Sequence, residues 1–207
     1  MKEFTNRINE LQRHWETTTE FDSPGYEGFK TTRRKELAKL ILEFNPKTVL
    51  EIGCLGGYNL REIHKLSPSV KLTGYDINAR ALEYAKSKLD VIETIHGSIH
   101  DLADVLNGQT FDVIFTAGVL IHIPSWDVTN RSVNKHYISN IIDNLCKHSN
   151  LGIVHAEEHG EKFCKKPNKG MRYIHNFNIL YQDKGTVHIQ RAPNPSNGFE
   201  HFVKVIK

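Results

Sequence analysis

Short apolar segments that predict strands alternate with amphipathic segments along most of this chain, and this alternation constrains its fold most. From residue 46 onward, the spacing suits strand–helix–strand crossovers. Such crossovers are right-handed and cover both faces of a parallel sheet with helices. We expect strands at 48–52, 70–75, 91–96, 111–116, 151–156, 186–191 and 201–206, with helices at 32–44, 60–66, 79–89 and 137–147.

The last two expected strands break this alternation. Residues 186–191 and 201–206 alternate apolar and polar side chains with only a loop between them, which predicts an antiparallel hairpin. The expected fold class is therefore α/β: a Rossmann-like, seven-stranded, mostly parallel sheet with helices on both faces and a C-terminal antiparallel hairpin.

Ahead of this core, Phe4, Ile8, Leu11 and Trp15 recur at helical spacing and predict an amphipathic helix. The 207 residues, of which 39% are hydrophobic, fit one folding unit. We expect a single domain, 1–207, with a helical lead-in at 1–45 and the Rossmann-like core at 46–207.

Charge and cysteine content exclude several classes of protein. The 27 basic and 24 acidic residues give a net charge of +3, too small to indicate a nucleic-acid partner. The cysteines, Cys54, Cys146 and Cys164, are three and widely spaced, which favours neither a disulfide framework nor a zinc ribbon. No segment has the composition of a signal peptide or membrane span, so we expect a soluble protein of the reducing cytoplasm with no membrane partner.

A glycine-rich turn follows the strand at 48–52. The run 49–59 reads Val-Leu-Glu-Ile-Gly-Cys-Leu-Gly-Gly-Tyr-Asn and joins a buried strand to a helix. Glycine permits a tight turn and lets a ligand approach the backbone, while the helix N-terminus offers free N–H groups. The alternative is an ordinary turn of any α/β protein.

An aspartate ends the next expected strand. Asp76 stands 23 residues after Gly53, where a carboxylate can accept both hydrogen bonds of a ribose diol. It can also cap the helix that begins near Asn78, and the two roles are compatible. A dinucleotide enzyme shares this ribose carboxylate but carries no acidic residue before its glycines, because its helix receives a pyrophosphate. Glu51 therefore favours a ligand with an ammonium group over a dinucleotide.

Together these features resemble class I S-adenosylmethionine-dependent methyltransferases, whose first motif is acidic-x-Gly-x-Gly-x-Gly. Leu55 occupies the middle glycine position here, and Gly56 sits beside Gly57. The segment 75–78, Tyr-Asp-Ile-Asn, resembles the family's ribose-binding step, with Ile77 against the adenine. The segment 96–101 resembles the part that borders the adenine, and its polar groups are expected to reach the exocyclic amine. Its alternative is a loop in which Asp101 caps the following helix.

The segment 111–124 resembles the family's fourth-strand motif, whose C-terminal end faces the donor. Thr116, Ala117 and Gly118 are small, as close approach to a sulfonium requires, and His122 follows them. Imidazole titrates near neutrality, so His122 is the candidate catalytic base or acceptor-orienting residue. Its alternative is a histidine packed beneath the loop.

The resemblance implies S-adenosyl-L-methionine as cofactor, and we expect no metal. The residues it implies in cofactor binding are Glu51, Gly53, Cys54, Gly56, Tyr58, Asn59, Asp76, Ile77, Ser98, Ile99, Thr116, Ala117 and Gly118. The run 118–124, with Asn59, looks like methylases associated with pseudaminic acid biosynthesis. The string His-Ala-Glu-Glu-His at 155–159 matches a zinc-protease motif, but that motif needs a helix and this string ends a strand.

We therefore expect a methyltransferase that modifies oxygen or nitrogen on a small polar acceptor, with a sugar or nucleotide-sugar as the first candidate. Two alternatives remain: a noncatalytic S-adenosylmethionine or S-adenosylhomocysteine binder that regulates a partner, and an NAD-dependent oxidoreductase. The acceptor pocket is expected to include residues of the N-terminal segment and of the loops after the fourth and fifth strands. The candidates are Trp15, Tyr26, Trp126, His155, Glu157 and Tyr173. For each of them the alternative is packing in the core or a place on the plain surface.

Overall fold

The computed structural model describes residues 2–22, 31–124, 126–127, 132–133, 135–161, 164–165, 172–193 and 201–207. The α-helices are α1 Lys2–Thr17, α3 Thr31–Leu42, α4 Tyr58–Leu66, α5 Ala79–Lys88, α6 Leu102–Leu106, α7 Lys135–His148 and α8 Phe177–Leu180. Short 3₁₀ helices are η1 Glu20–Asp22, η2 Ile99–Asp101 and η3 Leu120–His122. The strands are β1 Thr48–Ile52, β2 Lys71–Asp76, β3 Glu93–His96, β4 Phe111–Ala117, β5 Trp126–Asp127, β6 Ser132–Val133, β7 Ser149–Glu157, β8 Cys164–Lys165, β9 Tyr173–Ile174, β10 Thr186–Arg191 and β11 His201–Ile206.

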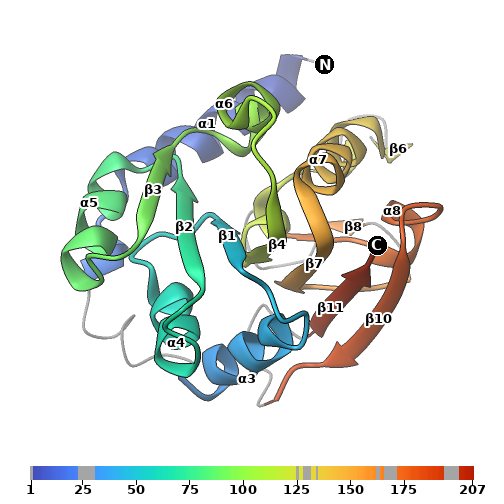
Figure 1. Cartoon of the computed structure of the whole chain (residues 1–207). Helices are drawn as coiled ribbons and strands as arrows, with labels where there is room; N and C mark the ends of the chain where they lie inside the picture. Colours follow the sequence, from blue (N-terminus) through green and yellow to red (C-terminus); the bar gives the residue numbers. More distant parts are fainter. Residues whose placement is uncertain are drawn as a thin grey trace.

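A seven-stranded sheet forms the centre of the molecule, in the order β10-β11-β7-β4-β1-β2-β3 (Figure 1). The five strands from β7 to β3 are parallel, whereas β11 pairs antiparallel with both β7 and β10. This arrangement confirms the expected fold class, including the C-terminal hairpin. Because β1 and β4 are central, residues that follow their C-terminal ends come together at one edge of the sheet.

Alternation along the strands divides the apolar core between the two faces of the sheet. Leu50, Ile52 and Ile114 pack on one face with apolar residues of α6, α7 and α8. Val49 and Val113 pack on the other face with residues of α3, α4 and α5. Burial on both faces explains the nearly continuous apolar runs that predicted these strands.

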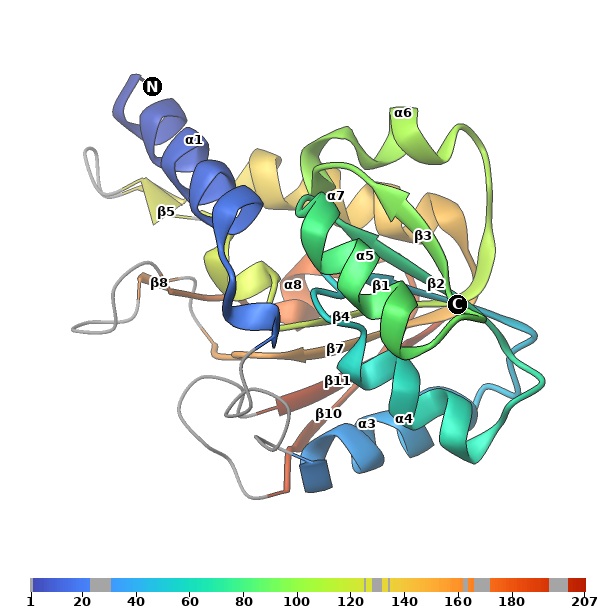
Figure 2. The same ribbon diagram turned by 90° about the vertical axis from the view of Figure 1, so that its left-hand side faces the viewer.

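Helix α1 covers the edge of the sheet where the parallel strands end. It lies beyond the ends of β2 and β3 in Figure 1, and it extends from the same side of the molecule as β5 and β8 in Figure 2. The Asn78 side chain fixes its C-terminal end, because Nδ2 donates to Trp15 O at 2.9 Å and to Thr18 O at 3.0 Å.

Several short elements were absent from the sequence-based prediction. They are the hairpins β5–β6 and β8–β9 and the single-turn helix α8. Elements of two to four residues are too short for a hydrophobic period, so only tertiary context reveals them. Among the described residues, no helix is long and apolar enough to cross a membrane.

The N-caps of α6 and α5 bear on the capping roles that the sequence suggested for Asp101 and Asp76. Asp101 holds the N-cap position of α6, where the alternative interpretation of residues 96–101 placed it, but its side chain makes no capping hydrogen bond. The cap of α5 is Asn78, whose Oδ1 accepts from Ala81 N at 3.1 Å. The string at 155–159 begins on strand β7, as expected, and not on a helix.

Candidate functional site

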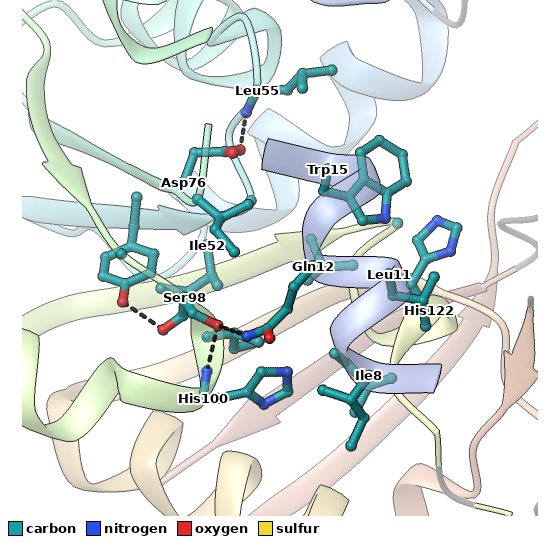
Figure 3. A pocket seen from close by; sticks show the side chains of 18 of the residues that line it. Ile8, Leu11, Gln12, Trp15, Ile52, Leu55, Asp76, Ser98, His100 and His122 are labelled. Atoms are coloured by element: carbon teal, nitrogen blue, oxygen red, sulfur yellow. Dashed lines mark hydrogen bonds between the residues drawn. The ribbon is translucent and has the colours of Figure 1, made fainter. Parts of the chain in front are cut away.

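A cavity of about 130 Å³ lies between the C-terminal ends of the parallel strands and helix α1. Its wall on the sheet side comes from the segments after β1, β2, β3 and β4, and α1 forms the opposite wall (Figure 3). Most of its lining is apolar, with a few polar side chains among the apolar ones. Ligand sites in open α/β sheets lie at this edge, and such a lining is typical of small-molecule pockets.

The loop after β1 takes an unusual backbone path. Gly53, Leu55 and Gly57 have φ values of 71°, 46° and 69°, so positive φ recurs at every second residue. These three positions match the glycines of the family motif, which identifies Gly57, and not Gly56, as its third glycine. Leu55 adopts a conformation that costs a non-glycine residue roughly 1–2 kcal/mol, and the surrounding structure must hold it there.

Asp76 holds this loop in place. Its Oδ2 accepts from Leu55 N at 2.7 Å, and its Oδ1 accepts from Asn78 N at 2.9 Å. The side chain is 6% exposed; burial raises its pKa, while the hydrogen bonds from Asn78 and Leu55 oppose that rise. Two carboxylate oxygens offer about four lone-pair positions, so Asp76 can still accept hydrogen bonds from a diol.

The segment after β3 carries Ser98 at the cavity wall. The Tyr75 hydroxyl donates to Ser98 O at 2.7 Å and fixes the backbone there. Ser98 Oγ accepts from Gln12 Nε2 at 2.9 Å and from His100 N at 3.3 Å. This segment is therefore joined directly to α1, across 86 residues of sequence.

The loop after β4 brings His122 to the cavity. Gly118 has a φ of 79° and turns the chain away from the sheet, so that η3 begins two residues later. The His122 ring packs beside the Trp15 indole of α1, with 4.9 Å between ring centroids (Figure 3). His122 and Trp15 thus lie in contact with each other at one end of the cavity.

Glu157 at the end of β7 anchors the loop after β4. Its Oε1 accepts from Val119 N at 2.9 Å and from Leu120 N at 3.1 Å, and its Oε2 accepts from Ile121 N at 3.2 Å. The side chain is fully buried. Glu157 therefore satisfies the first N–H groups of η3 and fixes the segment that carries His122.

Behind Glu157 lies a buried chain of hydrogen bonds. Thr116 Oγ1 donates to Glu157 Oε1 at 2.8 Å and lies 2.8 Å from His155 Nδ1, while His155 Nε2 lies 2.6 Å from the Tyr181 hydroxyl. Burial lowers the pKa of His155 to about 3, so its imidazole is neutral. If the proton of His155 is on Nδ1, this nitrogen donates to Thr116 Oγ1 and Nε2 accepts from the Tyr181 hydroxyl, so both ring nitrogens have partners.

The cavity gathers eight of the fourteen residues that sequence reasoning assigned to the site. Those that line it are Gly53, Asp76, Ile77, Ser98, Ile99, Ala117, Gly118 and His122; those that do not are Glu51, Cys54, Gly56, Tyr58, Asn59 and Thr116. Thr116 belongs to the hydrogen-bonded chain behind the loop. Tyr58 donates its hydroxyl proton to Phe21 O at 2.6 Å, which joins α4 to the N-terminal segment.

Other lining residues were missed by sequence reasoning. They are Ile8, Leu11, Gln12, Ile52, Leu55 and Tyr75, together with apolar residues around η3. Gly97 and His100 also line the cavity, and they belong to the segment 96–101 that was expected to border the adenine. Gln12 had a detectable signal, because it is a polar residue on the apolar stripe of α1.

The expected acceptor-pocket residues are largely elsewhere. Among them only Trp15 lines the cavity, while His155, Glu157 and Tyr173 are buried in the protein interior. Tyr26 and the side chain of Trp126 lie outside the described residues. Within the described ranges, no three His, Cys, Asp or Glu side chains are grouped so that they could hold a metal ion.

Glu51 is buried beneath the glycine loop. Its Oε1 accepts from Asn59 Nδ2 at 2.6 Å, and its Oε2 has no hydrogen-bond partner among the described residues. Burial raises the pKa of Glu51 to about 8, against opposing effects of Asn59 and Arg34. The carboxyl group of Glu51 therefore holds its proton more strongly than an exposed glutamate does.

This pKa predicts a pH-dependent stability. Between about pH 4.5 and 8, folded Glu51 keeps a proton that the unfolded chain releases, so the free energy of unfolding falls as pH rises through this window. In this window the wild type should lose ~1.4 kcal/mol of its free energy of unfolding per pH unit. Glu51→Gln, whose amide resembles the protonated acid, should not show this loss. In urea unfolding at pH 5, 6.5 and 8, the free energy of unfolding of the variant should rise relative to that of the wild type as the pH increases. The exposed Glu83→Gln serves as control, and a pH-independent difference for Glu51→Gln would contradict the prediction.

Comparison with known proteins agrees with this geometry. Residues 44–192 match a family described as a methyltransferase domain. Over 90 residues the chain is 34% identical to a demethylmenaquinone methyltransferase of Thermotoga maritima, a match that covers 44% of this chain and 38% of that protein. The chain thus spans well under half the length of this curated relative.

Solved methyltransferases share the fold at low sequence identity. Magnesium protoporphyrin IX methyltransferase of Synechocystis PCC 6803, with bound S-adenosylmethionine, is similar with a TM-score of 0.69, 14% identity and coverage of 97% of both chains. The N-terminal domain of EvdMO1, in the presence of S-adenosylhomocysteine and D-fucose, is similar with a TM-score of 0.60, 16% identity and coverage of 99% of this chain and 96% of that chain.

Proposed function

This chain belongs to the methyltransferase-domain family, and from that membership we propose that it transfers the methyl group of S-adenosylmethionine to an oxygen or nitrogen atom of a small polar acceptor. Sugars and nucleotide-sugars are the first candidates for that acceptor. Family membership and the class I fold support the donor; the cavity supports its location.

The observation that carries the donor site is the position of Asp76. Its carboxylate lies on the cavity wall beside the positive-φ loop and keeps lone pairs for the ribose hydroxyls. The apolar lining beside it, including Ile77, offers packing for the adenine. The cavity volume of about 130 Å³ is below the ~300–1,000 Å³ usual for ligand pockets, so side chains that line the cavity have to shift when the donor enters.

The acceptor is proposed to bind beside Trp15 and His122, at the end of the cavity where these two rings are in contact. An indole face beside an imidazole offers apolar contact to the C–H groups of a sugar ring and a polar group to its hydroxyls. The resemblance of 118–124 to pseudaminic acid methylases and the fold shared with EvdMO1, whose structure includes D-fucose, support sugars as the first test.

In the proposed reaction the protein positions the acceptor, and the cofactor supplies an already activated methyl group. S-adenosylmethionine supplies a methyl group already made electrophilic by its sulfonium. Trp15 and the segment around Gly118 would position the acceptor and exclude water from it. His122 accepts the acceptor's proton or orients its lone pair.

A screen with radiolabelled S-adenosylmethionine tests this proposal. Sugars, nucleotide-sugars and, for comparison, small aromatic hydroxyl compounds are offered to the full chain, and methyl incorporation is followed by chromatography and mass spectrometry. Transfer to a sugar is the expected result. Transfer to the aromatic compounds alone would contradict the proposed acceptor class, and binding of S-adenosylhomocysteine without transfer to any acceptor would favour a noncatalytic binder.

A further inference from the structure

Gln12 is the polar member of the cavity-facing stripe of α1. Ile8, Leu11 and Trp15 share this face and line the cavity with apolar or aromatic groups. The Gln12 side chain points from α1 toward Ser98 across the cavity, and its Nε2 donates to Ser98 Oγ at 2.9 Å (Figure 3). A polar residue on an otherwise apolar buried face lowers stability unless its hydrogen bonds are used.

Ser98 cannot itself receive a further hydrogen bond in this arrangement. A hydroxyl oxygen has two acceptor lone pairs, and those of Ser98 Oγ are taken by Gln12 Nε2 and His100 N. Its backbone carbonyl already accepts from Tyr75, and the imidazole of His100 is paired with the Tyr137 hydroxyl at 2.9 Å. The side chains of Ser98 and His100 are therefore engaged with the protein.

Gln12 offers a side-chain acceptor beside them. Gln12 Oε1 accepts no hydrogen bond from any described residue, and its carboxamide lies on the wall of the cavity next to Ser98. We propose that Gln12 Oε1 accepts a hydrogen bond from the 6-amino group of the donor's adenine, which makes α1 the element that distinguishes adenine from other purines. This inference rests on the proposed donor site and replaces the expectation that residues 96–101 bind that amine.

The chemistry of a carboxamide suits this role. Asparagine and glutamine pair with adenine by offering an acceptor to its amino group and a donor to a ring nitrogen. Ser98 fixes the amide with Nε2 toward the protein, so Oε1 is left for the ligand. Asn78 holds α1 one turn further along, at Trp15 O, which limits how far Gln12 moves from the cavity.

The test compares two ligands in calorimetric titrations of the full chain. One is S-adenosylhomocysteine, and the other is its analogue in which hydrogen replaces the 6-amino group. The wild type should bind S-adenosylhomocysteine roughly tenfold or more tightly, because the analogue leaves Oε1 without a partner. Gln12→Leu should bind both ligands with nearly equal affinity, and a wild-type ratio in Gln12→Leu would overturn the assignment.

Three variants separate recognition from the packing of α1. Gln12→Glu keeps an acceptor oxygen and should retain the preference for the 6-amino ligand. Asn9→Leu makes the same amide-to-leucine change on the exposed face of α1 and should leave the ratio unchanged. Ser98→Ala should also retain the preference; if it alone abolished the preference, Ser98 would be the acceptor and the assignment to Gln12 would be overturned.

Asp76→Ala distinguishes failure of this inference from failure of the donor site. It should weaken both ligands in parallel, by roughly tenfold or more, and leave their ratio unchanged. Wild-type affinity of Asp76→Ala for both ligands would overturn the donor site and the Gln12 assignment together. A normal loss in Asp76→Ala, with an unchanged ratio in Gln12→Leu, would overturn only the assignment of Gln12.

Discussion

Replacing Gly53 by valine is expected to abolish the binding of S-adenosylhomocysteine. Gly53 has a φ of 71°, and a Cβ atom there would overlap Val119 Cγ2. Both Gly53 and Val119 line the cavity, so either the loop after β1 or the segment before η3 must be displaced. Overpacking of this kind costs ~1–3 kcal/mol, and a β-branched residue at positive φ adds strain, so affinity should fall roughly 100-fold or more.

Calorimetric titration measures this loss, and circular dichroism reports whether the variant folds. Gly108→Val is the matched control: its φ is 83°, and no described atom lies within 4 Å of the position of its Cβ. It carries the same backbone strain without the overlap, and it should bind normally. The pair Gly53→Ala and Gly53→Ala/Val119→Ala tests the overlap itself, because removing the valine side chain should restore part of the binding. Normal affinity in folded Gly53→Val would exclude this loop from the donor site.

Removing the His122 imidazole should separate turnover from donor binding. His122→Ala should lose roughly 10²–10⁴-fold in methyl transfer, the range usual for a general base, while S-adenosylhomocysteine affinity stays near the wild-type value. The physical reason is its location beside Trp15, at the end of the cavity proposed for the acceptor. A base at this position also predicts a rate that rises with pH in the wild type and loses that rise in the variant.

The measurement is a pH–rate profile of both proteins with the acceptor found in the screen. His188→Ala, an exposed histidine on β10, controls for general effects of removing an imidazole. If His122 only orients the acceptor, KM should rise and the pH dependence should survive. An unchanged rate in His122→Ala would show that this ring serves only to pack against Trp15.

The parts of the site that sequence predicted are those defined by local chain geometry. A strand that runs into glycines, or that ends in an aspartate, is recognisable within about ten residues, and Gly53 and Asp76 both line the cavity. Leu55 is strained because its φ is positive, as it is at the neighbouring glycines. The motif tolerates Leu55 because Asp76 Oδ2 accepts a hydrogen bond from its N–H and holds this conformation. Glu51 matches the acidic position of the motif, yet its side chain is buried and is not among the residues that line the cavity.

The parts of the site that the sequence did not predict depend on hydrogen bonds between residues far apart in the chain. Gln12 meets Ser98 across 86 residues, and Glu157 meets Val119 across 38. Sequence reasoning placed His155 and Glu157 at the acceptor because they end a strand near the site. Their side chains instead turn into the interior, where alternation along β7 and the N–H groups of η3 determine what they bind. The hydrogen-bond partners of His155 and Glu157 cannot be inferred from the spacing of residues in the sequence.

The anchoring of η3 by Glu157 also has a consequence for the order in which the protein folds. The cavity is lined by segments between residues 8 and 124, but the carboxylate that fixes its loop comes from β7, whose last residue is 157. A chain emerging from the ribosome therefore carries every lining residue before it can hold them in place. Contacts over such sequence separations form late because closing long loops costs entropy. We therefore expect the donor to stabilise this protein only after β7 has joined the sheet.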